Sequence, residues 1–240
     1  MNDDLTRRGF LGVAGTSVAA GAVAGALAEG PAPALPDGPI KILGISTSPR
    51  KGKSTAVAVQ ACLDAAKAVD PARIEVELID LGGLKIDGAP AAGIPLAPGE
   101  QDDFPALVPK LGDKRVAGMI IGSPVYFGNM TSLCKAFLER WMVFRKDNFA
   151  LSNKVAGVLA VGAARNGGQE QTIRSIQTAL FCQEMIVVGE SRPSSHFGPG
   201  VWNKKEYNDD VSKDADGMAT VKNLGRRVAE VALRLAAARA

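Results

Sequence analysis

The stretch IKILGISTSPRKGKSTA, residues 40–56, decides the fold of this chain. Its first six residues are mostly apolar and include three isoleucines, the pattern of a short buried strand. A loop of hydroxyl and basic residues follows, and an alanine-rich helical pattern then runs from Ser54 to Ala68. A strand that passes through a polar loop into a helix is the first half of a βαβ unit, so the stretch predicts a parallel sheet in an α/β protein.

The same alternation continues along the chain. Further strands are predicted at 74–79, 116–121, 155–161 and 185–188, and further helices at 130–141, 169–181 and 217–238. The wholly apolar run at 116–121 indicates the sheet centre. We therefore predict an α/β flavodoxin-like fold, a doubly wound five-stranded parallel sheet with helices on both faces. Two long irregular segments, 82–104 and 191–216, interrupt the pattern, and loops of that length are usually functional or interfacial.

The N-terminus differs in kind from the rest. Arg7 and Arg8 precede an apolar run from Val13 to Ala28, which is typical of a twin-arginine export signal. The predicted parts are a signal at 1–28, a proline-rich spacer at 29–39 and one domain at 40–240. We expect a periplasmic or otherwise exported protein with no stable membrane span after cleavage, because the run is rich in Gly and Ala. A short membrane anchor or a dispensable tail is the alternative.

Charge and cysteine content narrow the function. The 28 basic residues are scattered among 25 acidic ones, for a net charge of +3, and this does not favour nucleic-acid binding. Cys62, Cys134 and Cys182 are far apart, so neither a metal site nor a disulfide framework is expected. His196, the only histidine, is interpreted as a surface residue, and no catalytic acid or base is predicted.

The loop after the first strand fits two kinds of phosphate site. Its second half, from Gly52, matches the end of a nucleoside-triphosphate P-loop, for which Asp80 would hold magnesium. That motif needs a glycine where this chain has Thr47, and Pro49 removes a backbone N–H donor. We favour a site for one phosphate monoester, built from hydroxyls, a basic side chain and a helix N-terminus. Its predicted ligands are Ser46, Ser48, Arg50, Ser54 and Thr55. A basic surface loop capped by Ser54 is the remaining interpretation.

Two more loops should meet this one, because ligands of an open doubly wound sheet bind at the carboxyl ends of its strands. After the third strand an aromatic pair and a glycine lie where backbone and rings could line a flat heterocycle. After the fourth strand a glycine-rich loop supplies further donors. The predicted ring-binding residues are Pro124, Val125, Tyr126, Phe127, Gly128 and Asn129, with Ala163, Arg165, Gly167 and Gly168 opposite.

These motifs, over about residues 40–189, resemble the flavodoxin-like flavoproteins that include the NAD(P)H-dependent FMN reductases and the iron-sulfur flavoproteins. The resemblance implies FMN, with its phosphate in the first loop and its ring against 124–129, in a homodimer or homotetramer. The chain departs from iron-sulfur flavoproteins in having no cysteine between 82 and 115, so a cluster is not expected. The family is mostly cytoplasmic, where its usual electron donor NAD(P)H is abundant, and an exported protein would lack that donor.

The expected function is therefore that of an FMN-binding oxidoreductase that passes electrons through the flavin to a quinone or another small acceptor. Two alternatives stay open. One is an exported electron carrier that docks to a protein partner, and the other is a flavin-free binding protein on the same fold.

Overall fold

The computed structural model describes residues 38–238 of the 240-residue chain. The predicted export signal and almost all of the predicted spacer lie outside the described residues. No helix within 38–238 is both long enough and apolar enough to cross a membrane.

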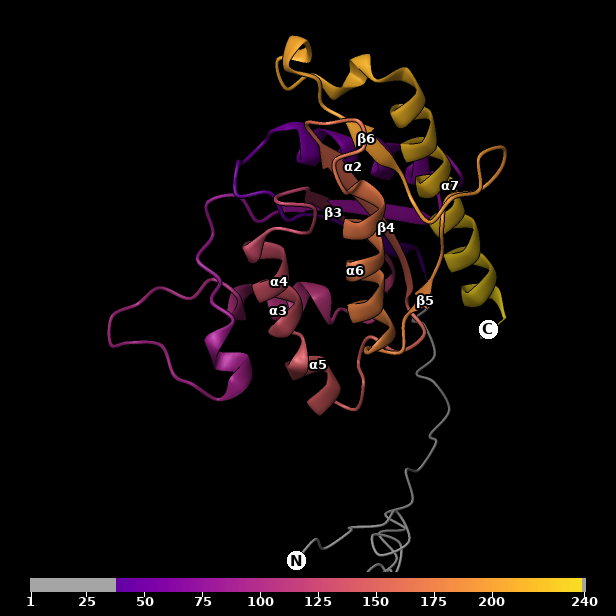
Figure 1. Ribbon diagram of the computed structural model, residues 1–240. Helices are drawn as coiled ribbons and strands as arrows, with labels where there is room; N and C mark the ends of the chain where they lie inside the picture. The colour runs from indigo at the N-terminus through magenta and orange to yellow at the C-terminus, as the bar shows by residue number, and fades with distance from the viewer. Residues whose placement is uncertain (1–37, 239–240) are drawn as a thin grey trace, which may run out of the picture. The chain divides into compact units, whose positions relative to one another are not determined.

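The described residues are built on a parallel sheet (Figure 1). Its strands are β1 (Ile40–Ser46), β2 (Ile74–Asp80), β3 (Val116–Pro124), β4 (Val155–Gly162) and β5 (Ile186–Val187), in the spatial order β2-β1-β3-β4-β5. All nine residues of β3 and all eight of β4 are buried, as the apolar runs predict. The flavodoxin-like fold with its parallel sheet is confirmed.

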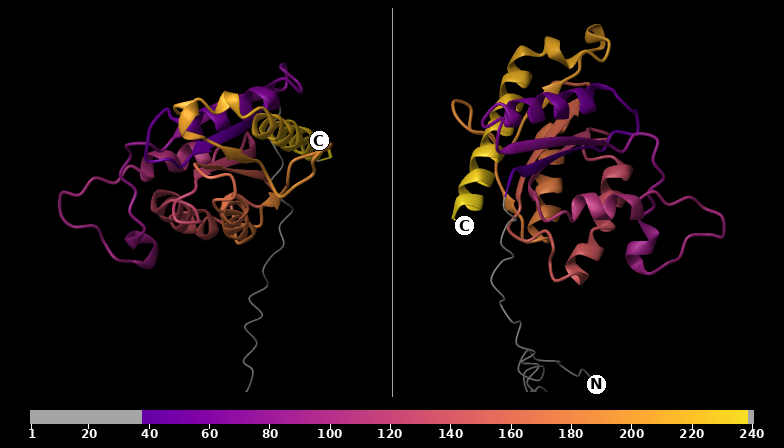
Figure 2. Two further views of the ribbon diagram at one scale, coloured as in Figure 1. Left: turned by 45° about the horizontal axis from the view of Figure 1, so that its top comes forward. Right: turned by 180° about the vertical axis from the view of Figure 1, so that it is seen from behind.

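Helices cover both faces of the sheet (Figure 2). On one face α2 (Ser54–Lys67) packs with α7 (Ala215–Ala237) over a core cluster of aliphatic side chains. The other face carries α4 (Ser132–Glu139) and α6 (Gln169–Phe181) with the short helices α3 (Val108–Leu111) and α5 (Met142–Lys146), and its core holds the aromatic side chains. Two hydrophobic layers therefore fix the sheet and leave its carboxyl edge open for the connecting loops.

One predicted helix is divided in the structure. The pattern at 130–141 predicts a single helix, but α4 begins only at Ser132 because Thr131 is its N-cap and accepts a hydrogen bond from Cys134 N at 3.0 Å. The helix ends at Glu139, and α5 starts three residues later.

The fifth strand is also corrected by the structure. The sequence predicts one strand at 185–188 and an irregular segment at 191–216. Instead, β5 pairs with Val155 and Ala156 near the start of β4, while a sixth strand, β6 (Gly200–Trp202), pairs with residues 160–162 at the end of β4. The edge position beside β4 is thus shared by two short strands, and three residues are too few to show an alternating pattern. The rest of the segment includes the short 3₁₀ helices η3 (Lys205–Tyr207) and η4 (Val211–Lys213).

The other long segment, residues 82–104, extends from the body and is called the arm below (Figure 1). It carries the 3₁₀ helix η1 (Ala89–Ala92), and η2 (Pro105–Leu107) follows it. Arg140 fastens its base by donating to both carboxylate oxygens of Asp102, at 3.1 and 2.7 Å. Lys85 N donates to Asp103 Oδ2 at 2.7 Å, which closes the neck of the arm.

Candidate functional site

The three predicted loops lie side by side at the carboxyl edge of the sheet. They are the first loop (47–53), the second loop (125–130) and the third loop (163–168). Ser46 is in register with Gly122, and Pro124 is in register with Val161. Thr47 N donates to Gly122 O at 2.8 Å, and Val125 N donates to Val161 O at 2.9 Å. The strand order therefore brings the predicted site residues together along one line.

Buried hydroxyl groups with capacity for a ligand lie in the first loop and at the ends of β1 and α2 that flank it. Ser46, Ser48, Ser54 and Thr55 are each no more than 2% exposed. Ser46 Oγ and Thr55 Oγ1 have no hydrogen-bond partner within the described part of the chain. An unpaired buried hydroxyl costs about 1–3 kcal/mol, and a bound phosphate oxygen would remove that cost. The donor set therefore fits a phosphate group.

The helix that follows the loop strengthens this fit. At the N-cap of α2, Lys53 provides no side-chain hydrogen bond, so the N–H groups of the first turn have no such cap. These groups and the helix dipole favour an anion. Ser48 instead shapes the turn, because its hydroxyl accepts a hydrogen bond from Arg50 N at 3.1 Å.

Asp80 supports the loop and was not among the predicted site residues. One of its carboxylate oxygens accepts from Gly52 N at 2.7 Å, and the other accepts from Gly82 N at 3.1 Å. Both oxygens therefore accept hydrogen bonds from backbone N–H groups, whereas the corresponding carboxylate of a P-loop protein would bind magnesium. The hydroxyl of Thr47, where a P-loop has glycine, donates to Gly122 O at 2.9 Å.

Arg50, a predicted phosphate ligand, is bound to a carboxylate in the structure. Its Nη1 and Nη2 donate to Asp209 Oδ2 and Oδ1 at 3.1 and 3.0 Å, and Lys53 Nζ lies 3.9 Å from the same carboxylate. The hydrogen bond from Arg50 lowers the pKa of Asp209 below its ordinary value, and one from Asn203 adds to the effect. Asp209 lies 159 residues from Arg50, and no sequence pattern indicates their contact.

The second loop presents aromatic side chains to solvent. Tyr126 and Asn129 exchange backbone hydrogen bonds at 2.9 and 3.2 Å, and the turn between them has positive φ at Phe127 (50°) and Gly128 (78°). Phe127 is fully exposed and Tyr126 is 44% exposed. A flat ligand could cover this apolar surface, which fits the predicted ring-binding role.

The third loop touches the second through a pair of glycines. Gly168 has a φ of 108°, and a Cβ there would lie 2.7 Å from Gly128 Cα. Gln169 fastens the third loop, since its amide donates to Ala164 O at 2.6 Å and accepts from Gly167 N at 2.9 Å. Ala163 and Arg165 are exposed. Only glycine fits this contact, so both loops depend on it to form one wall.

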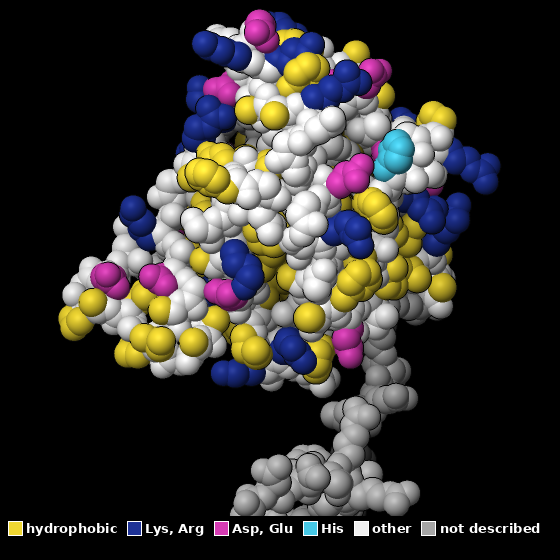
Figure 3. Space-filling view, viewed as in Figure 1, with side chains coloured by type: hydrophobic (Ala, Val, Ile, Leu, Met, Phe, Trp, Pro, Cys, Tyr) yellow, Lys and Arg dark blue, Asp and Glu magenta, His cyan; other side chains and the backbone are white. Residues whose placement is uncertain are grey.

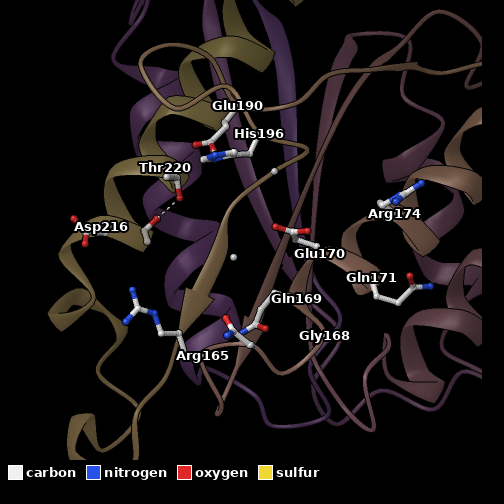
Figure 4. Close-up of a pocket in the computed structure, with 14 residues that line it drawn as sticks. Arg165, Gly168, Gln169, Glu170, Gln171, Arg174, Glu190, His196, Asp216 and Thr220 are labelled. Atoms are coloured by element: carbon white, nitrogen blue, oxygen red, sulfur yellow. Dashed lines mark hydrogen bonds and ion pairs between the residues drawn. The ribbon is translucent and has the colours of Figure 1, made fainter.

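A pocket of about 680 Å³ adjoins the third loop, between α6, β6 and the start of α7 (Figure 4). Arg165 and Gln169 lie at one end, and Glu190 and His196 lie together at the other. His196 Nδ1 is 2.7 Å from Glu190 Oε1, whose side chain is 1% exposed. The imidazole is 67% exposed, so His196 is a surface residue that also has a buried carboxyl partner.

Lys and Arg side chains are interspersed with Asp and Glu over the face shown in Figure 3.

The cysteines lie apart in the fold. Cys62 and Cys134 are buried, and burial raises the pKa of both thiols, that of Cys134 to about 12. Cys182 is exposed. Within residues 38–238 no group of three or more His, Cys, Asp or Glu side chains is placed to hold a metal ion.

Comparison with known proteins gives consistent results. The profile of the family described as NADPH-dependent FMN reductase matches residues 40–199. An iron-sulfur flavoprotein of Methanocaldococcus jannaschii is 38% identical over 80% of this chain and 97% of its own length. An NAD(P)H dehydrogenase (quinone) of Acidithiobacillus ferrooxidans is 33% identical over 49% of this chain and 64% of its own length. The solved structure of RosB with bound 8-demethyl-8-formylriboflavin-5'-phosphate has a TM-score of 0.65 at 15% identity, covering 84% of this chain and 82% of RosB. At that identity the likeness concerns the fold alone.

Proposed function

Since the chain belongs to the NADPH-dependent FMN reductase family and is an FMN-dependent oxidoreductase, we propose that it takes electrons from a reduced nicotinamide nucleotide and passes them to a quinone or another small acceptor. FMN supplies the redox chemistry when bound. The residues of this chain bind the flavin, orient it and set its surroundings.

One observation carries the proposal. Buried hydroxyl groups without hydrogen-bond partners lie at the same edge of the sheet as the two loops that could line a flavin ring. Ser46 Oγ, Thr55 Oγ1 and the first turn of α2 would hold the phosphate of FMN. The second loop would lie along the flavin ring, with Tyr126 or Phe127 flanking it. The third loop would close the opposite side through the Gly128–Gly168 contact.

The choice of acceptor rests on the name of a relative. The name of the Acidithiobacillus relative includes a quinone reductase activity, and this favours a quinone for the present chain. Iron-sulfur flavoproteins are also among the relatives, but residues 82–115 contain no cysteine. We therefore propose electron transfer through FMN with no iron-sulfur cluster.

The visible spectrum and steady-state turnover of the purified protein test this function. We expect flavin absorbance in the purified protein or after addition of FMN, bleaching of that absorbance by NADPH or NADH without oxygen, and turnover with a soluble benzoquinone. A protein that never acquires flavin absorbance would contradict the proposal. Bound FMN with no small-molecule turnover would favour an electron carrier that docks to a protein partner.

Export and assembly are further parts of the proposal. The twin-arginine pattern supports export to the periplasm, so replacement of Arg7 and Arg8 by Lys should retain the protein in the cytoplasm. Unchanged fractionation would contradict export. For assembly we propose a homodimer or homotetramer, and a monomeric mass by light scattering would contradict it.

A further inference from the structure

Residues 202–210, here called the strap, join β6 to η4 and contact two of the three site loops. The strap belongs to the segment that the sequence predicts as irregular. Its first residue, Trp202, contacts the third loop, and Asp209, near its end, binds the first loop. It therefore bridges two parts of the proposed FMN site.

Trp202 anchors the start of the strap. Its backbone N–H donates to Asp214 Oδ2 at 2.7 Å, and its indole Nε1 donates to Ala163 O at 3.0 Å. Lys204 Nζ lies 4.0 Å from the centre of the indole ring, and the Arg165 guanidinium lies 5.9 Å from it. The third loop is thus attached to the strap through the indole hydrogen bond and through the contact of Arg165 with the indole ring.

Asp209 binds the first loop with a geometry that leaves Arg50 further donors. The carboxylate takes one hydrogen bond from Nη1 and one from Nη2 of Arg50. A guanidinium has five N–H donors in a plane, so its Nε edge is still available for a second acceptor. Asp209 and a phosphate can therefore bind Arg50 at the same time.

The backbone around Asp209 is in the left-handed conformation. Asn208 and Asp209 are consecutive non-glycine residues with φ values of 50° and 66°. Asn and Asp adopt this left-handed region more readily than other non-glycine residues, and such conformations gather at functional sites. Asn203 Nδ2 donates to Asp209 Oδ1 at 3.0 Å and helps to hold the carboxylate in this position.

We propose that Asp209 is a positioning residue for the phosphate of FMN, because it fixes the Arg50 guanidinium beside the first loop. Through this contact and that of Trp202, the strap joins the first and third loops into one binding site. This inference rests on the proposed function. It assigns Arg50 two partners, Asp209 on its terminal nitrogens and the phosphate on its free edge.

Affinities for FMN and for riboflavin, which lacks the phosphate, test the inference by fluorescence titration. In the wild type we expect FMN to bind much more tightly than riboflavin. Arg50→Gln should weaken FMN binding about tenfold and leave riboflavin binding unchanged. Asp209→Asn should weaken FMN binding about three- to tenfold, again without an effect on riboflavin, and the double variant should match Arg50→Gln because both changes act through one guanidinium.

Asp210→Asn is the matched control. Asp210 lies on the same strap, binds Ser212 and Lys213, and should leave both affinities unchanged. Asn tolerates positive φ, so Asp209→Asn adds no backbone strain, and a thermal melt checks its folding. Asp209→Glu, which keeps the carboxylate, should recover part of the FMN affinity.

Two results would overturn the inference. One is an equal loss of FMN and riboflavin binding in Asp209→Asn, which would indicate a general structural role. The other is unchanged or tighter FMN binding, which would indicate that Asp209 competes with the phosphate for Arg50. Failure of the wild type to bind either flavin is a separate result and would contradict the proposed function itself.

Discussion

The arm (82–104) and the strap (202–210) belong to the two long connections that the sequence predicts as irregular, yet they are fastened to different parts of the molecule. The arm is held at its base by Arg140 against the aromatic core beneath α4, and only its first residue, Gly82, lies against the first loop, at Lys51. The strap is held by Trp202 and Asp209 against two of those loops. The length of an irregular segment therefore indicates only that the segment has a role. The residues that its side chains contact indicate whether that role is in stability or in the site.

If the arm and the strap differ in this way, disruption of the arm should change stability and leave flavin binding intact. The largest effect is expected for Phe104→Ala. This ring is 3% exposed, meets Phe137 edge to face at 6.1 Å and lies 4.7 Å below the Arg140 guanidinium. Truncation of a buried phenylalanine costs about 3–5 kcal/mol of unfolding free energy.

Urea unfolding measures that loss, and FMN titration of the folded variant should give a Kd within about twofold of the wild type, because distant sites act independently. A parallel loss of FMN affinity would show that the arm is coupled to the site and would contradict this difference between the arm and the strap.

Disruption of the strap should instead weaken flavin binding. Trp202→Ala removes the indole donor to Ala163 O and the ring between Arg165 and Lys204. We expect the Kd for FMN to rise about tenfold, since the third loop loses a hydrogen bond that fixes it. Trp202→Phe, which keeps a ring without the N–H, should have a smaller effect, and equal affinities in all three proteins would contradict the assigned role.

The ion pair at the base of the arm makes stability depend on pH. The hydrogen bond from Arg140 is the main cause that lowers the pKa of Asp102. Because the pKa of Asp102 is lower in the folded state, its ionised carboxylate stabilises the protein at pH values above the unfolded-state pKa of about 3.9. This stabilisation is lost as pH falls through the folded-state pKa.

Asp102→Asn should therefore cost about 1 kcal/mol at pH 7, an amount reduced by partial exposure of the pair. The difference from the wild type should shrink in urea titrations at acidic pH, as pH falls below the unfolded value of about 3.9 and then through the lowered folded-state pKa of the Asp102 carboxylate. An equal cost at both pH values would indicate a packing effect instead of charge.

The smallest effect is expected at the tip of the arm. None of residues 89–92 is buried, and the ion pair and neck that fasten the arm lie at its base. Replacement of residues 89–99 by a short Gly-Ser linker should change the unfolding free energy by less than about 1 kcal/mol, because loop-closure entropy varies slowly with length. A change in oligomeric mass by light scattering would instead identify the tip as a subunit contact.

Much of the fold could be predicted because its signals are local. The apolar runs of β1, β3 and β4 and the helical patterns of α2, α6 and α7 each lie within one short window of sequence. The position of the three site loops then follows from the general geometry of parallel sheets. The strand β6 was missed because three residues carry no period, and the break between α4 and α5 was missed because both flank one continuous apolar stripe.

By itself, then, the sequence determined the parallel α/β sheet, the sheet edge at which the three loops gather, and a set of hydroxyl and glycine residues suited to a flavin phosphate and ring. Only the tertiary structure decided that Ser46 and Thr55 have buried hydroxyls without partners, that Gly168 meets Gly128, and that Arg50 is bound to Asp209. The physical reason is range. Strand and helix patterns depend on neighbouring residues, whereas a hydrogen bond between side chains 159 positions apart depends on how the whole chain is packed.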